Sequence, residues 1–326
     1  MKGTHELTIQ SAHLRYDMQF SRNLTILQGN SATGKTTLVD MIQEYLLNGT
    51  DTGIALSCDC PCRVIAGNTW KEQLSLIENS IVFIDEGNRF VASEEFAVTI
   101  LGSSNYYVII TREALDNLPY SVTEIYGLRS SGKYNSMKPV YHQMYRIYGE
   151  ETVTSSMDDG SIIVEDSNSG YEFFGSLSEN SGRRCVSAGG AGNIFRMLQD
   201  CDSREGITVI ADGAAFGSQM GRIRQLMQRR SGIRLYLPES FEWLLLSSDI
   251  LDDTEVRHIL ENPSEYIESE RFNSWERFFT QLLIGKTQGT WLQYAKASLN
   301  PAYLQGKSLQ RIIGVLPTEV RRLFSV

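Results

Sequence analysis

The sequence contains no long run of apolar residues. No stretch approaches the ~20 apolar residues of a membrane-spanning helix, and the polar residues that follow Met1 give no sign of a secretory signal. These absences predict a cytoplasmic protein that makes no contact with a membrane. The net charge of −9 also argues against a generally basic nucleic-acid-binding surface, although it leaves room for a local basic groove.

Cysteine and histidine are scarce as well, since the 326 residues include five Cys and four His. Three of the thiols are concentrated at Cys58, Cys60 and Cys62, but there is no Cys-x-x-Cys pair and the histidines are scattered. The spacing therefore gives no standard zinc signature. Two interpretations stay open: a metal or redox cluster, and reduced thiols around a strand end and turn, of which the second is favoured.

Residues 29–36 match the G-x-x-x-x-G-K-[ST] pattern of a phosphate-binding loop. Its glycines let the backbone curl so that N–H groups point at phosphate oxygens. Lys35 is expected to reach the β- and γ-phosphates, and the Thr36 hydroxyl to ligate the bridging Mg²⁺. Apolar patterns predict a strand before the loop, at 24–27, and a helix after it, between 38 and 46. The expected nucleotide-binding residues are Gly29, Asn30, Ser31, Ala32, Thr33, Gly34, Lys35, Thr36 and Thr37.

A second element of the same site is the apolar run 81–84, which is followed by Asp85 and Glu86. A carboxylate at the end of such a strand holds Mg²⁺ opposite the loop hydroxyl, so Asp85 is the expected partner of Thr36 in metal binding. Glu86 is the expected catalytic residue, because a neighbouring carboxylate can orient or deprotonate the attacking water. The sequence therefore predicts an ATPase that depends on Mg²⁺.

A third apolar run, 107–110, ends close to Arg112, which is interpreted either as a γ-phosphate sensor or as a solvated loop residue. No Asn-Lys-x-Asp motif is present, so ATP is expected rather than a guanine nucleotide. With the short alternating strands predicted before position 20, region 1–150 resembles the ABC/SMC-like branch of P-loop ATPases. That resemblance implies ATP hydrolysis and a homodimer that completes the site. The Leu-Ser-Gly-Gly-Gln-like signature of the branch is absent, so the ATPase-like domain is minimal.

Polar residues from 149 to 160 predict a linker, after which expected strands alternate with expected helices. Four short apolar runs have the features of buried strands: 162–164, 185–187, 207–211 and 233–237. Four such β-α units in succession predict a small parallel sheet covered by helices. We therefore expect an α/β protein in three parts: an ATPase domain at 1–150, a second α/β domain at 151–252 and a helical C-terminal region at 253–326.

Acidic residues follow three of these expected strands. The carboxyl ends of parallel strands meet at one edge, where ligands bind, so the acids predict a second metal site: Glu165, Asp212, Glu239 and Glu242. The stretches 164–174, 189–194 and 209–213 resemble the motifs of Toprim domains. An ATPase joined to such a domain is similar in plan to the overcoming-lysogenisation-defect nucleases and related phage-defence proteins. The resemblance implies an ATP-regulated enzyme that cuts nucleic acid.

One departure from that family keeps two functions open. Toprim nucleases carry Asp-x-Asp after the third strand, whereas here Ala214 follows Asp212 and Gly213. Either Glu239 or Glu242 replaces the missing acid, or the domain binds a protein or nucleic-acid partner without cutting, as part of an ATP-dependent switch. A small-molecule kinase is disfavoured, because no acceptor site or lid arginines are evident. Five arginines are expected either to contact phosphates or to form a solvated face: Arg222, Arg224, Arg229, Arg230 and Arg234.

Overall fold

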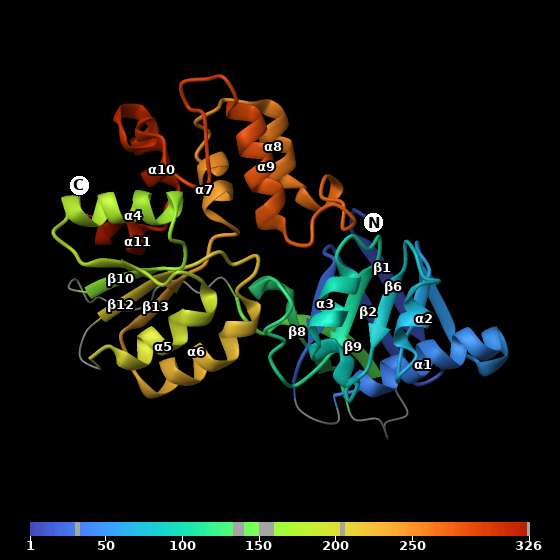
Figure 1. Ribbon diagram of the computed structural model, residues 1–326. Coiled ribbons are helices and arrows are strands. Elements are labelled where there is room, and N and C mark those ends of the chain that lie inside the picture. The colour runs from blue at the N-terminus through green and yellow to red at the C-terminus, as the bar shows by residue number, and fades with distance from the viewer. Residues whose placement is uncertain (30–32, 133–139, 150–159, 203–205, 325–326) are drawn as a thin grey trace. The chain divides into compact units, whose positions relative to one another are not determined.

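The computed structural model describes residues 1–29, 33–132, 140–149, 160–202 and 206–324. The chain divides into two units, of which the first holds Met1–Gly149 and Asn262–Ser274 and the second holds Glu150–Glu261 and Trp275–Val326. Within the described residues, the first unit is built on a mixed sheet of nine strands and the second on a parallel sheet of four (Figure 1). The α/β class expected from the sequence is therefore confirmed.

The first sheet has a parallel half, whose strands are fully buried at its centre. Every residue of the strands at 24–27, 81–84 and 106–110 is buried, as expected where helices or other strands cover both faces of a sheet. In order across the sheet, the parallel strands are β8 (Ile125–Ser130), β3 (Leu24–Leu27), β7 (Tyr106–Ile110), β6 (Ile81–Ile84) and β5 (Cys62–Val64). The strand at 106–110 thus separates the strand before the glycine-rich loop from the strand before Asp85.

The other half of this sheet contains antiparallel pairs. From its edge inward, the strands are β4 (Ala55–Cys58), β1 (His5–Gln10), β2 (Leu14–Phe20) and β9 (Val140–Arg146), the last antiparallel to β8. The two edge strands, β4 and β5, are joined by residues 59–61 alone. Because so short a segment spans at most about 14 Å, the sheet must curve until its two edges approach one another.

Helices fill both sides of the curved sheet. Leu38 lies in the hydrophobic cluster that includes Phe83, whereas Val82 lies in a second cluster with Trp70 and Phe96. The neighbours Val82 and Phe83 fall in different clusters because successive side chains of a strand point to opposite faces of the sheet. The helices of the first unit are α1 (Lys35–Asn48), α2 (Trp70–Leu74) and α3 (Glu94–Ile100).

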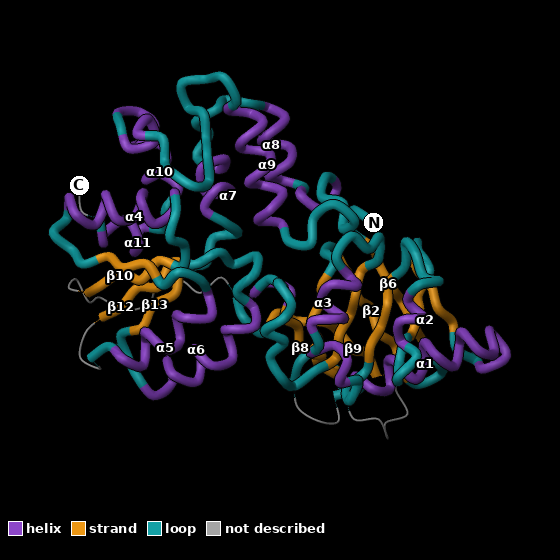
Figure 2. The backbone as a smooth tube through the Cα atoms, viewed as in Figure 1, coloured by secondary structure: helices purple, strands orange, loops and turns teal. Residues whose placement is uncertain are grey.

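The second unit has the regular alternation that the sequence predicts. Its parallel strands, in sheet order, are β11 (Cys185–Ser187), β10 (Gly160–Val164), β12 (Gly206–Ile210) and β13 (Ile233–Tyr236). Helix α4 (Ser169–Asn180) covers one face, while α5 (Ala191–Asp200) and α6 (Gly217–Arg229) cover the other (Figures 1 and 2). The four strands coincide with the expected runs to within two residues at each end.

The C-terminal helices do not form a third unit. The ring of Phe174 packs on Phe241 and on Phe324, with centroids 6.0 and 5.9 Å apart, which joins the end of the chain to α4. Residues 262–274 instead belong to the first unit, where the Gly3 amide donates to Ser264. The remaining helices are α7 (Phe241–Ser247), α8 (Thr254–Glu261), α9 (Trp275–Thr287), α10 (Gly306–Val315) and α11 (Thr318–Leu323). Among the described residues, no helix is both long and apolar enough to pass through a bilayer.

Candidate functional site

The glycine-rich loop follows β3 and leads into α1, as the sequence predicts. Gly29 and Gly34 have φ values of 125° and 88°, a region that side chains with a Cβ rarely enter. Lys35 begins α1, and its ammonium donates to the Gly29 carbonyl at 3.1 Å and to the Thr33 hydroxyl at 2.8 Å. The ammonium therefore lies between the two ends of the loop. Three further residues expected to bind nucleotide lie outside the described part of the chain: Asn30, Ser31 and Ala32.

The charge of Lys35 is enclosed, since the residue is 6% exposed. Burial lowers its pKa; the carboxylates of Glu86 and Asp85 oppose that effect, and the Arg112 charge adds to it. An anion placed beside the ammonium would compensate the cost of burying it. The loop thus presents a buried cation at the N-terminus of a helix, where anions bind.

Asp85 follows β6 and faces the start of α1. Burial raises the pKa of its carboxylate, with further contributions from the charges of Asp40 and Glu86, while the backbone of Glu86 and the side chain of Thr36 oppose that rise. Its Oδ1 atom is buried and has no hydrogen-bond partner among the described residues. A buried carboxylate oxygen without a partner is costly. A divalent cation beside Thr36 and Asp85 would satisfy that oxygen, so the donor set fits Mg²⁺.

Glu86 is held by Arg112. The guanidinium Nε lies 2.7 Å from Glu86 Oε1, and Arg112 follows β7, the strand between β3 and β6. Both side chains are partly exposed, at 56% for Arg112 and 36% for Glu86. Arg112 therefore follows the strand that lies between the other two, and it pairs with Glu86 while more than half exposed, so both interpretations of its role stay open.

Two residues that the sequence did not indicate contact the loop. The Tyr16 hydroxyl donates to the Gly34 carbonyl at 2.9 Å, and the Tyr16 ring stacks on His142 with centroids 4.4 Å apart. A Cβ at Gly34 would lie 2.7 Å from the Tyr16 hydroxyl oxygen. The alternation of β2 marks Tyr16 as buried, but no local pattern shows that it reaches a loop eighteen residues away.

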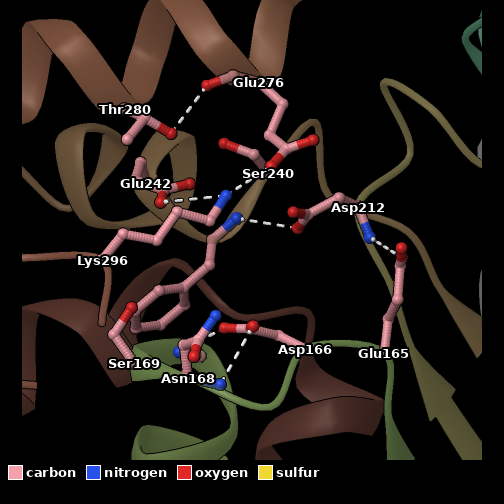
Figure 3. Close-up of polar contacts among 12 residues, drawn as sticks. Glu165, Asp166, Asn168, Ser169, Asp212, Ser240, Glu242, Glu276, Thr280 and Lys296 are labelled. Carbon is pink, nitrogen blue, oxygen red and sulfur yellow. Dashed lines mark hydrogen bonds and ion pairs between the residues drawn. The ribbon is translucent and has the colours of Figure 1, made fainter. Parts of the chain in front are cut away.

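The acids of the second unit have partners within the chain. Asp212 Oδ1 accepts the Phe241 N–H at the start of α7, at 3.0 Å, and the Asp212 N–H donates to Glu165 Oε2, at 3.0 Å (Figure 3). Asp166 caps α4 by accepting from the N–H groups of Ser167 and Asn168 at 2.7 and 3.0 Å, and from Gly170 at 2.9 Å. These acids thus stabilise the turns at the carboxyl end of the sheet.

Glu242 lies in a buried polar cluster with residues from the C-terminal region. It is 1% exposed, its Oε1 accepts from the Tyr294 hydroxyl at 2.8 Å, and Lys296 Nζ is 3.7 Å from the same oxygen. Lys296 also pairs with Glu276 (Figure 3). Glu242 Oε2 is buried without a hydrogen-bond partner among the described residues. Glu239 contributes its carbonyl, which accepts from the Ala214 N–H at 3.1 Å.

The pKa values report how these charges interact. Burial raises the pKa of Glu165 to about 7. Burial also raises the pKa of Asp212 well above its usual value, with added repulsion from Glu276, Glu165 and Glu242. For Lys296, burial lowers the pKa, but the carboxylates of Glu242 and Glu276 outweigh it and the net shift is upward. The Lys296 ammonium is the cation that these acids share.

The expected second metal site is not assembled in this structure. Across the described residues, the group of metal-binding side chains whose ligand atoms lie mutually within 4.8 Å is His5, Asp59 and Cys60, and it includes none of the four acids predicted for that site. The physical reason is that backbone N–H groups, Tyr294 and Lys296 engage the oxygens of Glu165, Asp212 and Glu242. Lys296 and Glu276 were missed because they lie far along the chain and carry no local motif.

Three of the five arginines expected near this edge hold the second unit together. Arg222 donates to Gln219 at 2.8 Å and lies over the Phe195 ring. Arg230 donates to the carbonyls of Leu198 and Cys201, and Arg234 is 7% exposed. Their guanidinium groups are thus engaged in packing, and the expected basic surface is smaller than the sequence suggested.

No protein-family model matches the chain, and no curated protein sequence matches it. The assignments above therefore rest on the geometry of the site.

Proposed function

We propose that the first unit binds Mg²⁺·ATP and hydrolyses it, and that the second unit is the non-catalytic partner-binding part of an ATP-dependent switch. This proposal follows the resemblance to ABC/SMC-like ATPases joined to a Toprim-like domain. One observation carries it: Asp85 Oδ1 is buried without a hydrogen-bond partner among the described residues. The other expected metal ligand, Thr36, directly follows the buried Lys35.

Each part of the first site has a role in this function. The loop amides and the N-terminus of α1 attract phosphate oxygens, and Lys35 neutralises them. Thr36 and Asp85 would hold Mg²⁺, which when bound supplies positive charge to the β- and γ-phosphates. Thr37, the next residue of α1, lies at the helix start, where its amide is within the first turn.

Hydrolysis is assigned to Glu86. A carboxylate directly after the metal-binding Asp is placed to orient or deprotonate water near the γ-phosphate. Its Oε1 is paired with Arg112 at 2.7 Å. A γ-phosphate offers Arg112 an alternative anionic partner, so we propose that nucleotide binding releases Glu86 from the pair.

For the second unit, internal charge compensation favours the switch over the nuclease. The Lys296 ammonium neutralises Glu242 and Glu276, and Asp212 caps α7. A metal-dependent nuclease would require these partners to be displaced before a cation could bind. Manganese-dependent nicking of DNA that is lost in Asp212→Ala would establish the nuclease instead.

The proposal is tested by calorimetric titration of Mg²⁺·ATP. Lys35→Ala is expected to abolish measurable binding, because it removes the cation between the loop ends. The matched control is Lys71→Ala, which removes an exposed lysine of the same unit that pairs with Glu95 and should bind as the wild type does. Unchanged affinity in Lys35→Ala would contradict the assignment.

A further inference from the structure

We propose that Cys58, Cys60 and His5, together with Asp59, form a binding site for a thiophilic divalent cation, Zn²⁺ in first place. One ligand atom each of His5, Asp59 and Cys60 lies within 4.8 Å of the others. Cys58 Sγ lies 3.7 Å from Cys60 Sγ and 3.7 Å from Asp59 Oδ1. Three potential ligands are therefore mutually close in the first unit, and Cys58 adjoins two of them. The site is independent of the proposed nucleotide function.

The spacing of the sulfur atoms suits a tetrahedral zinc ion. Two thiolates bound at about 2.3 Å in tetrahedral geometry lie about 3.8 Å apart, close to the 3.7 Å between Cys58 and Cys60. The same spacing also suits a thiol–thiol hydrogen bond, so the test must detect the metal itself.

The contact between His5 and Asp59 is of a kind that metal-binding histidines often make. His5 Nδ1 lies 2.8 Å from Asp59 Oδ2, and a carboxylate on one ring nitrogen commonly orients the other toward a metal. His5 Nε2 is buried and has no hydrogen-bond partner among the described residues. Asp59 therefore either ligates the ion or fixes the ring that does.

The fold explains why these residues meet. Strands β1 and β4 are antiparallel, with Leu7 opposite Cys58, and continuing that register by two residues places His5 opposite Cys60. The thiols lie on the segment 59–61 and at the strand ends that it joins, where the two edges of the sheet approach. A cation there would tie the edge strand β4 to β1 and to the segment that leads into β5.

The donor set also selects the metal. Thiolate and imidazole ligands favour Zn²⁺, whereas Mg²⁺ prefers oxygen ligands in octahedral geometry. The site should therefore ignore the Mg²⁺ that we assign to Thr36 and Asp85. Of the three remaining cysteines, Cys62 begins β5 in the first unit. Cys185 and Cys201 lie in the second unit and belong to no such group among the described residues, so they serve as controls.

The experiment measures zinc bound to the full-length chain. The reduced protein is stripped with a chelator, reloaded with Zn²⁺ and desalted, and its metal content is determined by mass spectrometry. We expect about one Zn²⁺ per chain, and a fall of roughly tenfold or more in Cys58→Ser/Cys60→Ser. Cys185→Ser/Cys201→Ser should keep the full content. Asp59→Asn should weaken zinc affinity by roughly ten- to hundredfold.

Cobalt gives a second readout of the same site. Co²⁺ added to the stripped wild type should produce an ultraviolet thiolate-to-metal charge-transfer band, and this band should be lost in the Cys58→Ser/Cys60→Ser protein. A circular-dichroism spectrum and melting temperature close to those of the stripped wild type show that this variant is folded. A wild type that holds no zinc after reduction, or that gives no cobalt band, overturns the proposal, as does equal zinc content in the two double variants.

Discussion

The two units both place carboxylates after parallel strands, but these carboxylates differ in the partners that surround their negative charge. In the first unit, Asp85 keeps a buried oxygen without a partner among the described residues, next to the hydroxyl of Thr36. In the second unit, the acids meet an ammonium of the chain itself, since Lys296 contacts both Glu242 and Glu276. The difference is one of direct contact, because Lys296 pairs with its acids whereas no ion pair among the described residues involves Asp85. Asp85 is therefore the acid that is more available to a metal.

The comparison also separates two uses of an acid at a strand end. Asp212 accepts the N–H of Phe241 and stabilises the start of α7, whereas Glu86 is partly exposed and paired with Arg112. A capping acid contributes to stability and loses its freedom to act on a ligand. An exposed, ion-paired acid contributes little to stability, so it can exchange its partner at small cost.

The largest expected effect is at Glu86. Glu86→Gln should reduce ATP turnover by roughly a hundredfold or more, because the amide cannot act as a base, while Mg²⁺·ATP affinity stays within a few-fold. Turnover is measured by phosphate release under saturating nucleotide. Glu113→Gln, an equal change of charge one residue beyond Arg112, should keep wild-type turnover. Equal rates in Glu86→Gln and the wild type would remove Glu86 from the mechanism.

The next largest effect is expected from a substitution that removes the cation of the second unit's polar cluster. Lys296→Met leaves Glu242 and Glu276 without their cation, and we expect a loss of about 3 kcal/mol in unfolding free energy. This is the low end for buried ion pairs because Lys296 is 37% exposed. Denaturant unfolding measures the change, and Lys307→Met, an exposed lysine of α10, is the control.

The same variant sharpens the comparison between the units. With the ammonium gone, Mn²⁺ should raise the melting temperature of Lys296→Met and leave that of the wild type unchanged. Such a result would mean that Lys296 occupies the place of a metal. If Mn²⁺ stabilises the wild type equally, the second unit already binds the cation, and this result would favour the nuclease function over the switch.

A third effect comes from the partly buried Glu165, whose pKa is raised by desolvation from 4.5 to about 7. A raised folded-state pKa means that the folded chain binds the proton more tightly than the unfolded chain does. The contribution to stability is therefore complete below about pH 4.5 and is lost as the pH rises through about 7. Between pH 5 and pH 7 the loss should be about 2 kcal/mol.

The measurement is the unfolding free energy across this pH range for the wild type and Glu165→Gln. The amide cannot titrate but can still accept the Asp212 N–H, so the variant should lose about 2 kcal/mol less between the two pH values. Parallel curves would show that Glu165 titrates outside this window.

Much of the fold was predictable because its signals are local. The strand at 24–27, the glycine-rich loop and the strand before Asp85 are marked by short apolar runs that end in glycine or acids. The four strands of the second unit are marked in the same way. The edge strands β4 and β5 were not predicted, because pairing with distant strands decides them, and their residues are only partly apolar.

The residues of a site could be predicted from the sequence only where they belong to short motifs. Lys35, Thr36 and Asp85 belong to motifs whose spacing encodes their geometry. The environment of Asp212 depends on Lys296 and Glu276, whose positions follow from packing of the C-terminal helices. The expected acidic edge therefore named the right strand ends but could not reveal the cation that the chain brings to them.

The smallest expected effect concerns one tyrosine in each unit whose hydroxyl group donates a hydrogen bond to a residue of a site. The Tyr294 hydroxyl donates to buried Glu242 at 2.8 Å and also contacts Ser169, whereas the Tyr16 hydroxyl donates to the neutral Gly34 carbonyl at 2.9 Å. A hydrogen bond to a charged group contributes about 1.5–3 kcal/mol and one to a neutral group about 1 kcal/mol. Tyr294→Phe should therefore destabilise the protein more than Tyr16→Phe, with Tyr141→Phe, an exposed tyrosine, as the control near zero.

Mg²⁺·ATP titration adds the second half of the test. Tyr16→Phe should weaken nucleotide binding by a few-fold because it loosens the loop, and Tyr294→Phe should leave it unchanged. If the two variants lose equal stability, the Glu242 carboxylate does not carry the charge that its pairing with Lys296 requires.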